Sequence, residues 1–220
     1  MRGDVIILED YHKAAAQKIV QNIIDDIKSL KRRFIITVGG ESGSGKSETG
    51  KAIMDALNGK GTKAVVIGQD DYFVLPPKTN DARRRADPNW LGPHIEVRMD
   101  LLEQHIIEAI QGNPVITKPL VDYQNDAILE EGLDLADVKV VIVEGTYTSL
   151  LRNVDKRIFI NRTREDTLAH RKKRERGKEV GDPFVEGILE IEHKIIAGHK
   201  HLADIIITKE YEVIFMNTLI

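Results

Sequence analysis

The stretch TVGGESGSGKSETG, residues 37–50, places glycines, a lysine and serines at fixed spacing directly after an apolar run. Gly40, Gly45, Lys46 and Ser47 match the pattern G-x-x-x-x-G-K-S/T, which forms a phosphate-binding loop (P-loop) where a strand leads into a helix. An incidental glycine-rich turn is the alternative, but the four positions would match by chance in only about 1 in 100 chains of this length. In a P-loop, the lysine reaches the β- and γ-phosphates and the serine hydroxyl binds Mg²⁺. The predicted nucleotide-binding residues are Gly40, Ser42, Gly43, Ser44, Gly45, Lys46, Ser47 and Glu48.

The composition limits the possible partners. The chain has 220 residues, of which 32 are basic and 35 acidic, giving a formal net charge of −3. A globally positive surface that would hold nucleic acid or an anionic membrane is therefore not expected. The chain has no cysteine, and no apolar stretch approaches the ~20 residues of a membrane span. We expect a single domain over residues 1–220 that works in the cytoplasm without nucleic-acid or membrane partners.

Apolar β-branched runs alternate with helical patterns along the chain. The runs are nearly all apolar, as strands buried on both faces of a parallel sheet are, and they lie at 34–38, 64–67, 138–143, 157–160 and 204–208. Helical periodicity is found at 10–31, 47–57, 100–110, 163–176 and 185–201. The alternation predicts βαβ units in an α/β core at 34–208, preceded by an extra N-terminal helix. Residues 72–99 are expected to be a long, weakly structured segment.

Acidic residues follow two of the predicted strands. Asp70 and Asp71 end the first of these strands and Glu144 ends the second. The carboxyl ends of parallel strands form the ligand-binding edge of an open α/β sheet. Phosphoryl transfer needs a metal ion and a carboxylate that orients or deprotonates the attacking hydroxyl. Asp70 and Glu144 can supply these carboxylates, although about half of such acidic residues merely cap turns.

A basic segment, NRTREDTLAHRKKRERGKE, follows the fourth predicted strand. On a helix, His170, Arg171 and Arg174 would lie within one turn of one another. A solvated basic helix face is the simpler explanation. The position of the segment favours a lid over residues 163–178 that closes on the nucleotide, with Arg171 and Arg174 gripping phosphate.

Motifs over about residues 34–208 resemble, in order, those of the uridine kinase, phosphoribulokinase and pantothenate kinase group of P-loop kinases, and uridine kinases most. The matching segments are GGESGSGKS, VVIGQDDYF, KPLVDY, VVIVEGTY, RIFINRTREDTLAHRKKRERGK and HLADIIITK. The resemblance implies a P-loop NTPase fold with a five-stranded parallel sheet, order 2-3-1-4-5, flanked by helices. It implies an ATP- and Mg²⁺-dependent phosphotransferase acting on the alcohol group of a small molecule. Asp70 would be the catalytic base, Ser47 and Glu144 would serve the metal with Asp70 beside them, and Arg171 and Arg174 would act from the lid.

The segment that recognises the base in uridine kinases is changed. Val121, Asp126 and Ile128 stand where the resemblance places tyrosine, histidine and arginine, so the acceptor site is expected to be altered. The candidate acceptor residues are Asp71, Tyr72, Arg85, Asp87, Asp122 and Tyr123. The alternative is a regulatory P-loop protein that hydrolyses or senses nucleotide without an acceptor; a switch GTPase is disfavoured because its N-K-x-D and D-x-x-G motifs are absent. The N-terminal helix and the end YEVIFMNTLI either cover a sheet edge or form a contact in a homo-oligomer.

Overall fold

A computed structural model describes residues 6–87, 89–163, 165–167 and 182–216 of the chain. Its centre is a six-stranded sheet in the order β2-β5-β1-β6-β7-β8. The strands are β1 (Phe34–Gly40), β2 (Ala64–Gly68), β5 (Val140–Glu144), β6 (Lys156–Ile160), β7 (Ile205–Ile207) and β8 (Val213–Phe215). The first five of these in space are parallel, and they correspond in chain order to the predicted arrangement 2-3-1-4-5, which is confirmed.

The sixth strand was not predicted. β8 pairs antiparallel with β7 and so continues the sheet beyond its last parallel strand. The C-terminal end was expected either to cover a sheet edge or to form a contact in a homo-oligomer. Residues 213–215 cover the edge of the sheet at β7. Pairing through a short turn satisfies backbone groups that an exposed edge would leave open.

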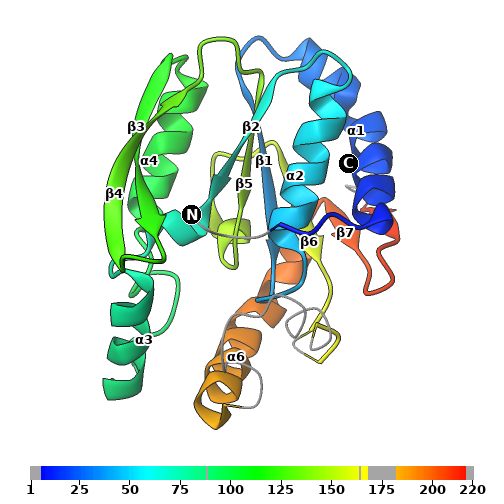
Figure 1. Cartoon of the computed structure of the whole chain (residues 1–220). Helices are drawn as coiled ribbons and strands as arrows, with labels where there is room; N and C mark the ends of the chain where they lie inside the picture. The colour runs from blue at the N-terminus through cyan, green and yellow to red at the C-terminus, as the bar shows by residue number, and fades with distance from the viewer. Residues whose placement is uncertain (1–5, 88, 164, 168–181, 217–220) are drawn as a thin grey trace.

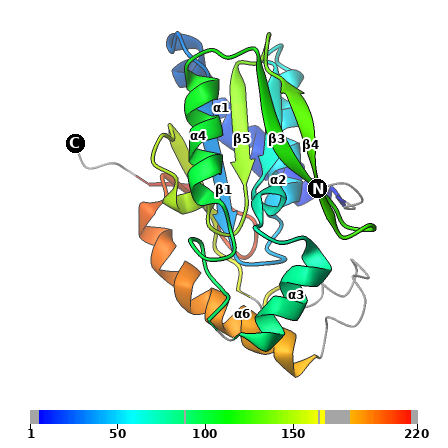
Figure 2. The ribbon, with the colours of Figure 1, turned by 90° about the vertical axis from the view of Figure 1, so that its left-hand side faces the viewer.

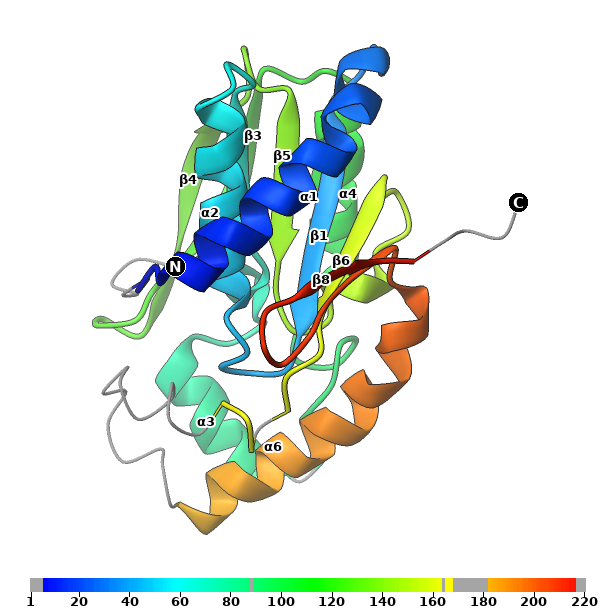
Figure 3. The ribbon, with the colours of Figure 1, turned by 90° about the vertical axis from the view of Figure 1, so that its right-hand side faces the viewer.

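Helices cover the two faces of this sheet (Figure 1). Alternate residues of β1 face opposite layers: Ile36 packs into the core beneath α1 (Asp10–Ser29) and α2 (Lys46–Asn58), while Ile35 packs into the core beneath α4 (Met99–Ile110). Residues of β5 alternate in the same way. Burial on both faces explains why these strands are apolar throughout. The predicted N-terminal helix is confirmed as α1, which packs on α2 as an additional element of that layer (Figure 3).

The expectation of weak structure over residues 72–99 is wrong in part, because α3 (Pro77–Ala86) forms within it. Proline in the first turn suits a helix start, and ion pairs at i, i+4 spacing stabilise the exposed face. Asp126 also binds the first turn, accepting bonds from the backbone N–H of Lys78 at 2.6 Å and of Thr79 at 3.2 Å. These partners are distant in sequence, which is why local patterns did not indicate the helix.

An antiparallel hairpin of β3 (Val115–Asp122) and β4 (Ala127–Asp134) was also missed. It forms a separate two-stranded sheet beside α4 (Figure 2). Pro119 lies within β3, and a proline in a strand ordinarily argues against strand assignment. In a two-stranded sheet both strands are edges, so the missing N–H is tolerated.

The remaining helical elements lie at the carboxyl edge of the sheet, where α3 and α6 (Pro183–Ile196) are seen below the strands (Figures 1 and 2). The predicted helix at 185–201 is α6 continued by the 3₁₀ segment η4 (Ala197–Leu202). Residues 165–167 form a turn, so the predicted helix does not begin at 163. Most of the predicted lid, with Arg171 and Arg174, lies outside the described residues. Within the described part of the chain, no helix has both the length and the hydropathy that crossing a bilayer requires.

Candidate functional site

The P-loop has the geometry expected of an anion cradle. It joins β1 to α2, as predicted, and α2 begins at Lys46, so the loop lies against the N-terminus of a helix. Gly45 takes a left-handed φ of 99° at the N-cap. At Gly40, with φ 149°, a Cβ would lie 2.9 Å from the carbonyl oxygen of Ile160. Lys46 Nζ donates to the carbonyl oxygen of Glu41 at 2.9 Å, which holds the ammonium group over the loop.

Asp70 and Glu144 are brought to the same edge by strand register. Glu144 pairs with Gly68 of β2 on one side and with Val38 of β1 on the other. Asp70 follows Gly68 in the short 3₁₀ segment η1 (Gln69–Tyr72). This register places both residues at the edge of the sheet where β1 leads into the P-loop, and their roles as site residues stay a prediction.

The electrostatics of Glu144 reflect this crowding. Desolvation raises the pKa of Glu144 to about 7, and the negative charges of Asp70 and Glu48 add to the shift. The ammonium group of Lys46 and a hydrogen bond with Ser47 act in the opposite direction. A cation stabilises a carboxylate that lies among other carboxylates, so the region around Glu144, Asp70 and Ser47 favours the binding of a cation.

The oxygen donors at this corner fit Mg²⁺. The Ser47 hydroxyl, Glu144 and Asp70 offer oxygen alone, which is the ligand set that Mg²⁺ prefers. Across the part of the chain that the structure describes, no three His, Cys, Asp or Glu side chains form a ready-made cage for a metal ion. Mg²⁺ commonly binds through one or two carboxylates together with substrate phosphates, so the absence of such a cage is consistent with this arrangement.

Asp71 and Tyr72, two of the candidate acceptor residues, point into the protein. Asp71 accepts from Lys118 Nζ at 2.8 Å and from the backbone N–H of Val121 at 3.0 Å, so it ties β3 to η1. Tyr72 is fully buried, with its hydroxyl 2.8 Å from His105 Nδ1 on α4. These contacts of Asp71 and Tyr72 hold the η1 backbone in place, and the neighbouring Asp70 lies at the edge of the sheet.

The other four candidates lie on α3, at its C-terminal end and in the hairpin. Arg85 contacts Asp81 and Asp182, and its guanidinium group lies 4.1 Å from the ring centroid of Phe184. Asp87 pairs with Arg83, and Asp122 accepts backbone N–H groups of the hairpin turn. Tyr123 is exposed at that turn.

A buried polar network centred on Glu96 was missed. Glu96 has no exposed surface and accepts hydrogen bonds from Arg84 Nε at 2.7 Å and Asn80 Nδ2 at 3.0 Å. Asn80 in turn accepts from Trp90 Nε1 at 2.8 Å. Arg83, Arg84 and Arg85 are consecutive in the sequence, and only the helical geometry of α3 shows that the middle arginine turns inward.

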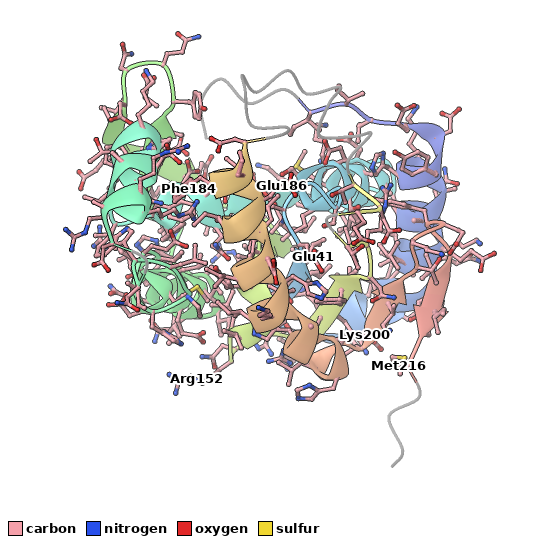
Figure 4. All side chains as sticks on the ribbon, turned by 90° about the horizontal axis from the view of Figure 1, so that it is seen from below. Glu41, Arg152, Phe184, Glu186, Lys200 and Met216 are labelled. Carbon is pink, nitrogen blue, oxygen red and sulfur yellow. The ribbon has the colours of Figure 1, made fainter. Side chains whose placement is uncertain are left out.

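A contact between α6 and the P-loop was also missed. Glu192 accepts from the backbone N–H of Ser42 at 2.8 Å and from its hydroxyl at 3.1 Å. His193 Nδ1 lies 2.6 Å from Glu41 Oε1, and Figure 4 shows Glu41 beside α6. Burial raises the pKa of Glu192, while Lys46, Ser42 and Arg84 oppose the shift. No sequence signal marks this residue, because it is one of several acids on an amphipathic helix.

The fold and the P-loop together define an α/β P-loop protein with the architecture of small-molecule kinases. The chain belongs to the Phosphoribulokinase / Uridine kinase family, whose model matches residues 35–209. This agrees with the resemblance inferred from the sequence motifs.

Curated relatives include kinases of different acceptors. The chain is 28% identical over 183 residues to a uridine kinase of Bacillus cereus, covering 79% of this chain and 84% of that protein. It is 29% identical over 147 residues to the uridine kinase of Ureaplasma parvum, covering 65% and 69%. It is 25% identical over 193 residues to the bifunctional alpha-galactosidase/sucrose kinase AgaSK of Mediterraneibacter gnavus. That match covers 83% of this chain but only 21% of the length of the relative.

Solved structures support the fold. A putative fructose transport system kinase from Silicibacter sp. matches with a TM-score of 0.63 at 18% identity, covering 86% of this chain and 94% of that one. A D-glycerate 3-kinase from Cryptococcus neoformans matches with a TM-score of 0.61 at 14% identity, covering 91% and 98%. At these identities the likeness establishes the architecture alone.

Proposed function

We propose that the protein is an ATP-dependent phosphotransferase that transfers the γ-phosphate to the alcohol group of a small molecule. The observation that carries the proposal is the position of Asp70 and Glu144 at the strand edge in front of Lys46 and Ser47. A nucleotide-binding regulator needs the P-loop, but it has no need of a further carboxylate at the place where an acceptor would meet the γ-phosphate.

The nucleotide side of the site, formed by residues 40–48 with Asp70 and Glu144, binds and orients the donor. Backbone N–H groups of the loop and the start of α2 hold the phosphates, and Lys46 exchanges its carbonyl partner for phosphate oxygens. Ser47, Glu144 and Asp70 would hold Mg²⁺. When bound, the ion would neutralise negative charge on the β- and γ-phosphates.

Asp70 acts on the acceptor. Its carboxylate accepts the proton of the acceptor hydroxyl as the hydroxyl oxygen bonds to the γ-phosphorus. The bond from that phosphorus to the β–γ bridging oxygen breaks, giving ADP and a phosphate monoester. Arg171 and Arg174, proposed from the sequence, would stabilise the charge of the transferred group from the lid.

The acceptor side, which we assign to α3, the β3–β4 hairpin and α6, supports an acceptor other than a pyrimidine nucleoside. Asp126, which stands in the place of a base-recognising histidine, is occupied by the first turn of α3. Val121 is buried and donates its backbone N–H to Asp71. The relatives' names point to sugars, hydroxy acids and uridine, and these define the substrates to test.

The experiment is ADP release from Mg-ATP across uridine, cytidine, free hexoses, sucrose, D-glycerate and pantothenate, with Asp70→Asn as the control. Release that requires one acceptor and disappears in the variant supports the proposal and identifies the acceptor class. Acceptor-independent release, or ATP binding without release, would instead indicate a regulatory hydrolase or a nucleotide sensor.

A further inference from the structure

The rear of the P-loop carries backbone carbonyls that need partners. In a peptide unit the N–H and C=O groups point in opposite directions, so a loop that turns its N–H groups towards phosphate turns its carbonyls away from it. The Tyr211 hydroxyl donates to the carbonyl oxygen of Ser44 at 3.0 Å and lies 3.5 Å from that of Gly45. It also lies 3.5 Å from Thr49 Oγ1 in the first turn of α2. A single hydroxyl group therefore contacts both the P-loop and the first turn of α2, the helix that follows the loop.

Tyr211 is held in an unusual backbone conformation to make this contact. Its φ is 65°, in the left-handed region that residues other than glycine rarely occupy. The turn between β7 and β8 fixes it: its backbone N–H donates to Thr208 at 2.9 Å, and the N–H of Thr208 donates to Glu212 at 2.8 Å. Strain of this kind persists where the surroundings over-determine it, and it tends to be found at functional positions.

The ring of Tyr211 is enclosed by neighbours from three parts of the chain. Tyr11 and His12 of α1 lie with ring centroids 4.5 and 4.9 Å away, and the guanidinium group of Arg162 lies 5.4 Å from the ring centroid. The fit against the loop is close, since a Cβ at Gly45 would collide with the Tyr211 hydroxyl. Burial raises the pKa of Tyr211 to about 12, so the hydroxyl keeps its proton at neutral pH and can donate a hydrogen bond.

We propose that Tyr211 is a positioning residue that holds the rear of the P-loop, so that the loop keeps its N–H groups directed at the phosphates of the nucleotide. The proposal rests on the proposed function only in taking the P-loop as the nucleotide site. Tyr211 and α1 both lie outside residues 35–209, so this support is built from segments that the family model does not include.

The test is Tyr211→Phe, which removes the hydroxyl and keeps the ring. Loss of one hydrogen bond of ordinary strength predicts binding weakened about 3- to 10-fold. We expect the Kd of Mg-ATP and the Kd of inorganic triphosphate to rise by the same factor, while kcat at saturating ATP stays within about 2-fold. Tyr11→Phe is the matched control, because its ring contacts Tyr211 and it should bind both probes as the wild type does.

Each outcome decides the proposal. Equal weakening for both probes, seen in Tyr211→Phe and absent in Tyr11→Phe, supports it. Unchanged Kd values would overturn it, because the hydroxyl would then have no role in binding. Weakening for ATP alone would overturn it by indicating a contact with the base. The same weakening in Tyr11→Phe would overturn it by indicating a general effect of the aromatic cluster. Thermal melting of both variants identifies a loss that comes from unfolding. Because direct binding needs no acceptor, the test can succeed even if no kinase activity is found.

Discussion

The nucleotide side and the acceptor side of the site are built in different ways. On the nucleotide side, one continuous segment binds through backbone groups, and the register of β1, β2 and β5 adds two carboxylates. On the proposed acceptor side, groups from α3, the hairpin and α6 meet across long sequence separations, as Lys78 does with Asp126 and Arg85 with Asp182. Backbone-built sites leave a regular pattern in the sequence, while side-chain networks depend on which face of each element turns inward.

The adjacent pair Asp70 and Asp71 gives the sharpest test of this division, with the largest expected effect. Asp70→Asn removes the proposed base, so we expect kcat to fall about 10²- to 10⁴-fold while the Kd of ATP changes less than about 3-fold. Steady-state kinetics with the acceptor that the ADP-release panel identifies, and direct ATP binding, measure the two quantities.

Asp71→Asn is the matched variant. It removes one of the two carboxylates that pair with the buried Lys118, since Asp71 lies 2.8 Å from Lys118 Nζ, and leaves Glu131 at 2.6 Å. We expect loss of stability with kcat per folded molecule largely retained. If Asp71→Asn lost turnover as severely as Asp70→Asn without unfolding, the two carboxylates would not have the separate roles that their positions indicate.

Arg83 and Arg84 test whether the acceptor side is built on buried side chains. Arg84→Ala leaves Glu96 buried and lacking its cation, so we expect the free energy of unfolding to fall by about 3 kcal/mol, as measured by chemical denaturation. The KM of the acceptor should rise as well, with the Kd of ATP little changed.

Arg83→Ala removes an exposed i, i+4 pair with Asp87 and a contact of the guanidinium group with the ring of Trp90, and should cost about 1 kcal/mol or less. Equal costs for the two arginines would contradict the inward placement of Arg84. A large loss of ATP affinity in Arg84→Ala alone would show that the two sides are not separable.

The same division explains what the sequence could predict. The P-loop, the parallel strand order and the meeting of Asp70 with Glu144 followed from local pattern and from the rule that strand carboxyl ends share one edge. The hairpin was missed because Pro119 interrupts its pattern, and α3 was missed because Asp126, far along the chain, helps to fix its first turn. Glu192 could not be found, because its partner Ser42 is 150 positions away.

Glu192 is where the two sides touch, and its charge should produce the smallest effect. Its carboxylate accepts a hydrogen bond from the backbone N–H of Ser42, so a negative charge lies next to the P-loop, which is expected to bind the anionic phosphates. Glu192→Gln keeps an oxygen for that N–H and removes the charge, and we expect the Kd of Mg-ATP to fall about 3- to 10-fold near pH 8. Glu190→Gln, an exposed neighbour on α6 paired with Lys194, is the control and should not change the Kd.

The pH dependence has a definite sign. Because burial raises the pKa of Glu192, the nucleotide-free protein protonates it above the usual carboxyl range, and the protonated form repels phosphate less. Lys46 and Arg84 oppose this shift, and Tyr147 also faces the carboxyl group. The advantage of Glu192→Gln should therefore be greatest near pH 8 and shrink as the pH falls, because the wild-type carboxyl group then becomes neutral as well. Titration of ATP itself affects both proteins alike and cancels in the ratio of their Kd values. A ratio that stays constant with pH would mean that Glu192 acts through shape and hydrogen bonding, and that its charge does not influence nucleotide binding.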